Sequence, residues 1–137
     1  MMDIISALLS FLKADTAVAA LADTRIYAAE LPRAEIESMP QKIAVLRYAG
    51  GVERNRFLPI AEPRIDILSF GETYHEAGKL DRAIYAALKA LNRETVDNVL
   101  LHGIALSGGP LMLRDSDTGS PYQARSITVT ADERSTA

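Results

Sequence analysis

The stretch Thr73–Asn92, TYHEAGKLDRAIYAALKALN, carries the most regular pattern in the chain. Thr73 and Glu76 have the spacing of a capping box, in which each side chain hydrogen-bonds a free backbone N–H at the start of a helix. At 100° per residue, one stripe of such a helix is apolar: Ala77, Leu80, Ile84, Leu88 and Leu91. The pattern predicts a helix from Thr73 to about Asn92 whose apolar stripe faces a core.

Segments with strand character lie on both sides of this helix. Lys42–Tyr48 is rich in β-branched and aromatic residues and ends before two glycines. Arg64–Phe70 alternates the apolar Ile65 and Ile67 with charged residues, as expected for a strand with one buried face. Three later segments are also predicted strands: Val99–Ser107, Leu111–Arg114 and Tyr122–Ala131.

The N-terminal part completes the predicted order of elements. Asp3 can cap an N-terminal helix, Arg25–Tyr27 is a short strand, and Leu31–Pro40 is predicted to be a loop. The order predicts an α+β fold with a mostly antiparallel sheet of about four to six strands. The N-terminal helix and the Thr73–Asn92 helix are expected on one face of this sheet. We expect residues 1–137 to form a single structural domain, with residues 132–137 as a frayed tail.

The composition is that of an ordinary globular domain, since 48% of the 137 residues are hydrophobic and 24% are charged. The net charge of −3 provides no overall basic field for nucleic acid, although a local basic patch is compatible with it. The chain has no cysteine, which excludes disulfides and thiolate metal sites and fits assembly in a reducing cytoplasm. No apolar run approaches the roughly 18 residues of a membrane span, so we expect no membrane segment.

Residues for catalysis or metal binding show no recognisable arrangement. His75 and His102 stand alone, without a second histidine at the spacing that places two ligands on one helix face. Asp115–Gly119 begins like a calcium loop, but Ser126 occupies the position of the bidentate glutamate, and the same residue types are typical of a turn. No nucleophile elbow or phosphate-binding glycine loop is present. The sequence therefore predicts that the protein is not an enzyme and has no metal site or cofactor. One alternative stays open, a pair of converging carboxylates drawn from Glu30, Glu35, Glu37 and Asp66.

Asp81 lies inside the apolar stripe of the Thr73–Asn92 helix, where an unpaired carboxylate would cost several kcal/mol. One interpretation is a buried ion pair with Arg47 or Arg64 on the sheet. The other interpretation is that the helix meets a second subunit at Asp81.

The connection Gly50–Pro63 is longer than a hairpin turn, and a connection of this length in a compact domain is usually functional or disordered. It carries Arg54, Asn55, Arg56 and Phe57, so polar and basic side chains are followed by an apolar one. We consider these four residues candidates for a contact with a partner.

The order of these segments resembles the tail terminator, tail-completion and head–tail joining proteins of long-tailed phages and phage-derived particles. The most similar part is the opening, in which Leu21 is followed by Arg25-Ile26-Tyr27 and then by Leu31-Pro32. The strands, the central helix and a closing hairpin over Asp115–Val129 follow in the same order, so the resemblance covers most of the chain.

The resemblance implies a structural role in the virion, at the junction of tail and head. In that family a ring, commonly a hexamer, caps the tail tube, stops its growth and offers a docking surface to the head connector, while DNA passes through the hole. The implied partners are further copies of the chain, the tail tube protein and the head connector or neck proteins, assembled in the cytoplasm of a bacterial host. Arg54 and Arg56 would then face DNA or a neighbouring subunit.

Closure of a ring requires two different patches on each subunit. An uncovered strand edge is a template for pairing, and either Arg25–Tyr27 or the terminal strand is expected to supply it. Two alternatives stay open. The first is a neck or head–tail connector protein of the same particle. The second is a small-ligand-binding or enzyme domain whose site is built from dispersed carboxylates and arginines.

Overall fold

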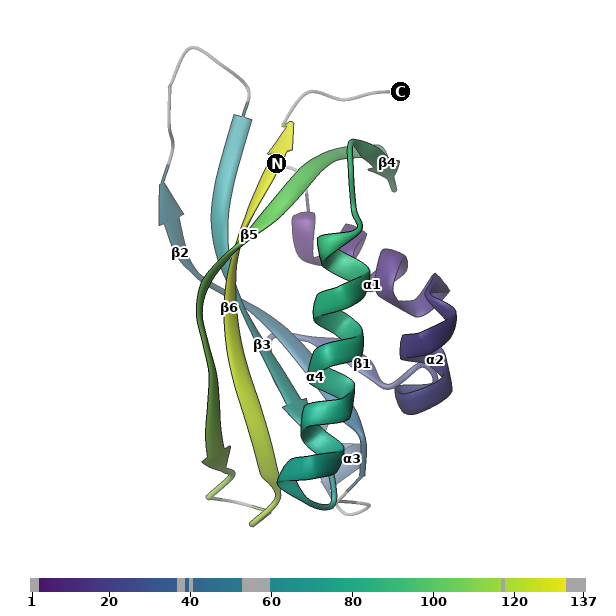
Figure 1. The fold of residues 1–137 in the computed structure, drawn as a ribbon, viewed down its shortest axis with the longest axis vertical. Coiled ribbons are helices and arrows are strands. Elements are labelled where there is room, and N and C mark those ends of the chain that lie inside the picture. The colour runs from purple at the N-terminus through teal and green to yellow at the C-terminus, as the bar shows by residue number, and fades with distance from the viewer. Residues whose placement is uncertain (1–2, 37–38, 40, 53–59, 117, 133–137) are drawn as a thin grey trace.

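The computed structural model describes residues 3–36, 39, 41–52, 60–116 and 118–132. Figure 1 shows its elements, which follow this order: α1 (Ile4–Ala14), α2 (Thr16–Ala22), β1 (Ile26–Ala28), α3 (Arg33–Ile36), β2 (Ile43–Val52), β3 (Ile60–Phe70), α4 (Tyr74–Lys89), β4 (Glu94–Val96), β5 (Val99–Arg114) and β6 (Pro121–Asp132).

All six strands belong to one sheet, with the order β1-β2-β3-β6-β5-β4. Only β1 and β2 pair in parallel, and the other neighbours are antiparallel. Helices α1, α2 and α4 pack on one face of the sheet, where their apolar residues join those of the strands in one core. The predicted α+β fold, with a mostly antiparallel sheet and helices on one face, is confirmed.

The alternation of side chains along the strands places the main core on the helix side of the sheet. Ile65 and Ile67 on β3 face the helices together with Ile127 and Val129 on β6, and all four are at most 1% exposed. The residues between them, Asp66 and Thr128, point to the opposite face. The two central strands, β3 and β6, therefore have one apolar and one polar side over much of their length.

A second, smaller apolar cluster lies on the opposite face of the sheet. It consists of Ile43, Val45, Leu68 and Phe70, with residues around α3 packed against it. Since β2 also contributes Ala44 and Leu46 to the main core, its first half is buried on both sides. This explains the continuous apolar run at the start of β2, which does not alternate.

The helix caps expected at Thr73 and Asp3 are present. Thr73 caps α4 by accepting a hydrogen bond from the backbone N–H of Glu76, and the helix ends at Lys89. The Glu76 carboxylate, the other half of the predicted capping box, pairs with Lys42 and Lys79 instead. Asp3 caps α1, and Asp15 caps α2 by accepting from the backbone N–H groups of Ala17 and Val18. Among the described residues, no single helix is long and apolar enough to cross a membrane, and α1 with α2 meets the length and composition only as a pair bent by 89°.

The structure corrects four details of the sequence prediction. Helix α3 lies within the predicted loop Leu31–Pro40, and β4 was not predicted because its three residues are too few to show a period. The predicted connection Gly50–Pro63 is shorter, because β2 runs to Val52 and β3 begins at Ile60. Asp132, placed in the predicted frayed tail, is buried at the end of β6.

The two glycines expected to end the strand, Gly50 and Gly51, are instead part of β2. Gly50 has a φ of 98°, which glycine tolerates, and the register of β2 and β3 shifts between Tyr48 and Gly51. Beyond the shift, Gly51 pairs with Pro63 and Val52 with Glu62.

Gly71 connects β3 to α4 at a close approach of two backbone segments. A Cβ atom at this position would lie 2.5 Å from the backbone nitrogen of Ala77. We therefore expect Gly71→Ala to lower the free energy of unfolding by about 1–3 kcal/mol, measured by urea denaturation. Gly108→Ala is the matched control, because the nearest atom to its Cβ would be Arg64 Nη2 at 4.0 Å. Equal stability of the two variants would contradict the close packing at Gly71.

Candidate assembly surface

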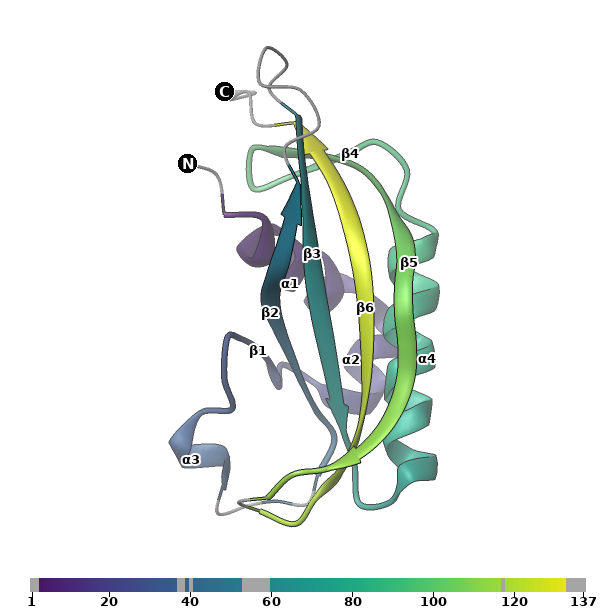
Figure 2. The same cartoon turned by 90° about the vertical axis from the view of Figure 1, so that its left-hand side faces the viewer.

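Most of β5 forms a free edge of the sheet. On one side, β6 pairs with β5 from Leu100 to Arg114, whereas on the other side β4 pairs only with the segment Val99–Leu101. The segment 103–114 therefore has no neighbouring strand on its outer side within the described part of the chain. Figure 2 shows this strand along the border of the sheet, next to α4.

This edge is apolar on both faces. Leu111, Met112 and Leu113 are 61%, 69% and 42% exposed, and Leu106 is 47% exposed. They are four of the six large hydrophobic side chains that are exposed in the described residues. Cross-strand pairs place Leu106 and Met112 on the helix side of the sheet and Leu111 and Leu113 on the open side. An unpaired strand with exposed apolar residues on both faces indicates an interaction surface.

The edge also contains features that restrict what can pair with it. The β5–β6 register shifts between Leu106 and Gly108 and again between Gly108 and Leu111. Pro110 has no backbone N–H to donate to an added strand. The register shifts and Pro110 interrupt the edge, so they limit its pairing with strands of other proteins. The segment Leu111–Arg114, which follows the interruption, is the part of the edge that can still accept a partner.

The sequence predicted two candidate edges, and the structure places one of them at an edge of the sheet. The terminal strand was one candidate, but β6 lies between β3 and β5 and has both sides paired. The other candidate, Arg25–Tyr27, is close to β1, which is an edge strand of only three residues. The exposed residues Leu111 and Met112 on β5 were not singled out from the sequence, because an apolar strand residue shows its exposure only once the strand order is known.

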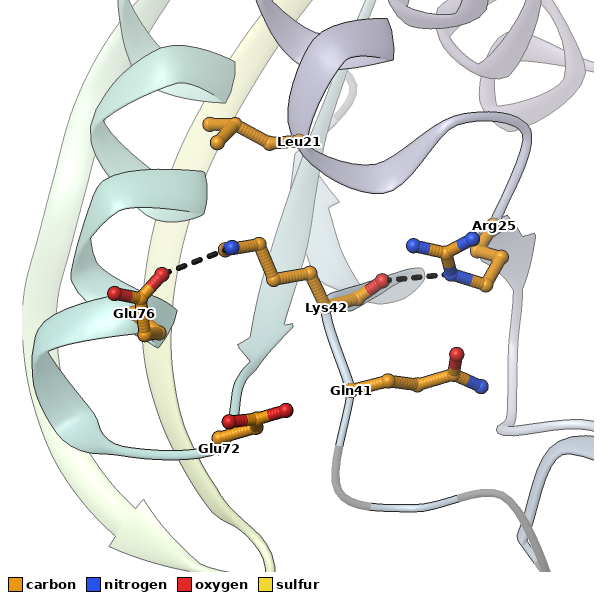
Figure 3. Close-up of a pocket in the computed structure, with 6 residues that line it drawn as sticks. All are labelled: Leu21, Arg25, Gln41, Lys42, Glu72 and Glu76. Atoms are coloured by element: carbon orange, nitrogen blue, oxygen red, sulfur yellow. Dashed lines mark hydrogen bonds and ion pairs between the residues drawn. The ribbon is translucent and has the colours of Figure 1, made fainter.

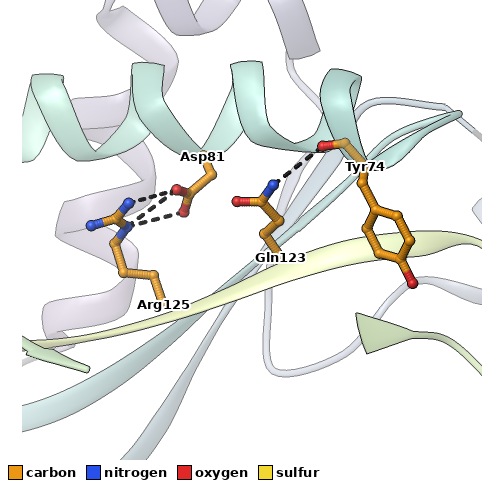
Figure 4. A network of polar contacts seen from close by, with 4 residues as sticks. All are labelled: Tyr74, Asp81, Gln123 and Arg125. Atoms are coloured by element: carbon orange, nitrogen blue, oxygen red, sulfur yellow. Dashed lines mark hydrogen bonds and ion pairs between the residues drawn. The ribbon is translucent and has the colours of Figure 1, made fainter. Parts of the chain in front are cut away.

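Asp81 forms a buried ion pair with Arg125 (Figure 4). Arg125 Nη2 lies 2.7 Å from Asp81 Oδ2, and Arg125 Nε donates to both carboxylate oxygens at 3.1 and 3.2 Å. Asp81 is 1% exposed and Arg125 is 8% exposed. The guanidinium also lies 4.1 Å from the ring centroid of Tyr85, one helical turn after Asp81. Two side chains of α4 therefore hold one arginine of β6.

A second polar contact joins α4 to β6, and we call the two contacts together the α4–β6 seam. Gln123 Nε2 donates to the backbone carbonyl of Tyr74 at 3.2 Å, in the first turn of the helix. Gly78 leaves room for it, because a Cβ atom there would lie 2.8 Å from Gln123 Nε2. The seam fixes both the position and the rotation of α4 on the sheet.

The predicted partners of Asp81 were wrong. Arg47 and Arg64 lie on the open face of the sheet, on the opposite side from the helices, and Arg47 Nε is 3.9 Å from Asp66. The other candidate residues, Arg54, Asn55, Arg56 and Phe57, lie outside the described residues, and their contacts stay a prediction.

A polar pocket of about 250 Å³ lies where α2, the start of β2 and the start of α4 meet (Figure 3). Lys42 Nζ is 2.8 Å from Glu76 Oε2, and Lys79 Nζ is 3.3 Å from the other oxygen. Hydrogen bonds from Lys42 and then Lys79 lower the pKa of Glu76 below its usual value. The pocket thus stabilises a charged carboxylate, whereas a general acid needs a raised pKa. Its volume is below the roughly 300–1,000 Å³ of typical ligand sites.

Among the described residues, the other titratable groups are dispersed. In residues 3–36, 39, 41–52, 60–116 and 118–132, no group of three or more His, Asp and Glu side chains is placed to hold a metal ion. Glu35 accepts hydrogen bonds from Tyr27 and Gln41, while Asp66 accepts one from Ser126 on the sheet. In the calcium-like segment, Asp115 Oδ2 accepts from the backbone and hydroxyl of Thr118, as in a capped turn.

Comparisons with known proteins support the fold. No protein-family model matches the chain, and no curated protein matches it in sequence. Among solved structures, it is similar to a chain of a structure described as "Virion of native gene transfer agent (GTA) particle", with a TM-score of 0.69 and 17% identity, over 94% of each chain. The chain therefore has the fold of a protein found in a gene transfer agent virion.

Proposed function

We propose that this protein is a structural component of a phage-like particle and that it acts as a tail terminator. In this role a ring of copies, commonly six, caps the tail tube and offers a docking surface to the head connector. The observation that carries the proposal is the shared fold with a chain of a gene transfer agent virion over almost the full length of both chains.

The β5 edge provides physical support for self-association. A monomer that exposes Leu111, Met112 and Leu113 on an unpaired strand has apolar surface that association would remove from water. A ring also needs a second patch that differs from the first. A non-enzymatic role agrees with the ion-paired state of Glu76 in the Lys42 pocket.

The proposal includes the partners and the place of the ring. These are the tail tube protein on one side, the head connector or neck proteins on the other, and DNA that passes through the hole. The ring belongs to the virion and assembles in the cytoplasm of the bacterial host. Arg54 and Arg56 are proposed to face the pore or a neighbouring subunit.

Deletion of the gene in a strain that produces the particle tests the function. A tail terminator stops polymerisation of the tube, so electron microscopy of the deletion strain should show overlong tails without attached heads. A plasmid copy should restore complete particles, and a copy with Arg54→Glu and Arg56→Glu should not. Tails of normal length that stay separate from heads would instead identify a neck or connector protein. Complete, infectious particles without the gene would contradict both roles.

A further inference from the structure

The two borders of the sheet differ in charge. Figure 2 shows β5 and α4 on one side of the molecule and β1 and α3 on the other. Exposed cations flank the β5 border, namely Arg82 and Lys89 on α4 and Arg114 at the end of β5. Over the N-terminal part, residues 3–36 contain five acidic and three basic residues. At this border Asp23 and Glu30, on either side of β1, are exposed, together with one cation, Arg33 on α3.

Both borders also expose apolar side chains. Leu111 and Met112 lie on the β5 border, and Ile36 at the end of α3 is 39% exposed on the other. In Figure 2, α3 and the end of β5 lie toward the same end of the long axis. An apolar contact between these borders is therefore compatible with subunits arranged side by side at the same height.

A symmetric contact between two β5 edges is disfavoured by charge. A twofold axis at this edge would bring the α4 helices of the two copies together, because α4 lies directly over the strands next to the border. Arg82 and Lys89, which lie on the β6 side of α4, would then be brought closer to the cations of the other copy. Like charges in contact are unfavourable, whereas β5 against the β1–α3 border brings cations toward carboxylates.

We propose that the β5 edge of one copy binds the β1–α3 border of the next copy, in a head-to-tail contact. The inference rests on the proposed ring and names the two surfaces that form it. Such a contact is heterologous, so it can repeat around an axis and close. Leu111 and Met112 are the apolar centre of one half, and Ile36 is the apolar centre of the other.

The absence of cysteine in the chain permits a direct test. Variants with Met112→Cys, Ile36→Cys and both changes replace the gene in the producing strain, and a short bis-maleimide reagent is added to the particles. Antibody to the protein then detects cross-linked species by denaturing electrophoresis. The double variant should give a ladder in multiples of the 14.9 kDa chain that ends at the number of subunits in the ring. Each single variant should stay monomeric.

The control variant combines Met112→Cys with Arg64→Cys, because Arg64 is exposed on the open face of β3, which lies between β2 and β6 and away from both borders. It should give no ladder. Dimers from Met112→Cys alone would show a symmetric contact and overturn the proposal, as would a double variant without a ladder.

The result is separate from that of the gene deletion. Overlong tails on deletion with no ladder would leave the tail terminator function in place and remove the proposed contact. A ladder together with complete particles in the deletion strain would retain the contact and remove the function.

Discussion

Replacement of Asp81 by alanine is expected to lower the free energy of unfolding by about 3–5 kcal/mol, because it leaves a buried arginine without its partner. Arg125 is 8% exposed and makes a bidentate contact with Asp81, so little solvent is available to replace the carboxylate. A domain of this size has a total stability of roughly 5–15 kcal/mol. The variant should therefore be largely destabilised, which urea denaturation followed by circular dichroism will measure.

Two further variants distinguish the loss of the buried ion pair from the loss of any carboxylate on the sheet. Asp66→Ala removes a carboxylate from the open face of the sheet, where Arg47 is half exposed, and should cost within about 1 kcal/mol. Asp81→Leu combined with Arg125→Met replaces both charges by apolar groups and should recover much of the loss. If Asp81→Ala were as stable as Asp66→Ala, the ion pair would not hold α4 on the sheet.

Introduction of two glutamates on the β5 edge, Leu111→Glu with Met112→Glu, is expected to abolish incorporation of the protein into particles. Burial of one Leu or Met side chain contributes about 1.5–3 kcal/mol, so the loss of both weakens a contact by roughly 100- to 10,000-fold. The folded monomer should keep its stability within about 1 kcal/mol, because both side chains point to solvent. Quantitative mass spectrometry of purified particles measures the incorporation.

Arg64→Glu is the matched control for the edge. Arg64 is exposed, like the edge residues, but it lies on β3, which has β2 and β6 on its two sides. The control should be incorporated at the level of the unchanged protein. Incorporation of the double glutamate variant at that same level would show that the edge is not an assembly surface.

The helix α4 and the central strands could be predicted because their patterns are local. The stripe from Ala77 to Leu91 repeats with the period of a helix, and Ile127 and Val129 alternate with polar residues. Thr73 marks the start of α4 through its spacing to Glu76. Such patterns depend only on residues that are close in the sequence, so they can be recognised before the order of strands in the sheet is known.

The partner of Asp81 could have been found from the same alternation. Arg125 is two positions before Ile127, with one residue between them, so it belongs to the helix-facing set of β6. Arg64 is adjacent to Ile65 and therefore belongs to the open face. The alternation of side chains therefore excludes Arg64 as the partner of Asp81 and leaves Arg125. This conclusion also requires that the last strand is known to lie beneath α4.

The free edge of β5 could not have been found in this way. Leu111 and Met112 look like core residues in the sequence, since strands with large apolar side chains are usually buried. Their exposure follows from the position of β5 beyond β6 and from the short length of β4. Both are long-range properties of the sheet, which no local pattern encodes.

A cryo-electron microscopy reconstruction of the head–tail junction of the particle would show the proposed ring itself. We expect a closed ring of copies of this chain at the end of the tail tube, with the β5 edge of each copy against the β1–α3 border of the next. A junction without this chain, or a ring in which Leu111 and Met112 face solvent, would contradict this expectation.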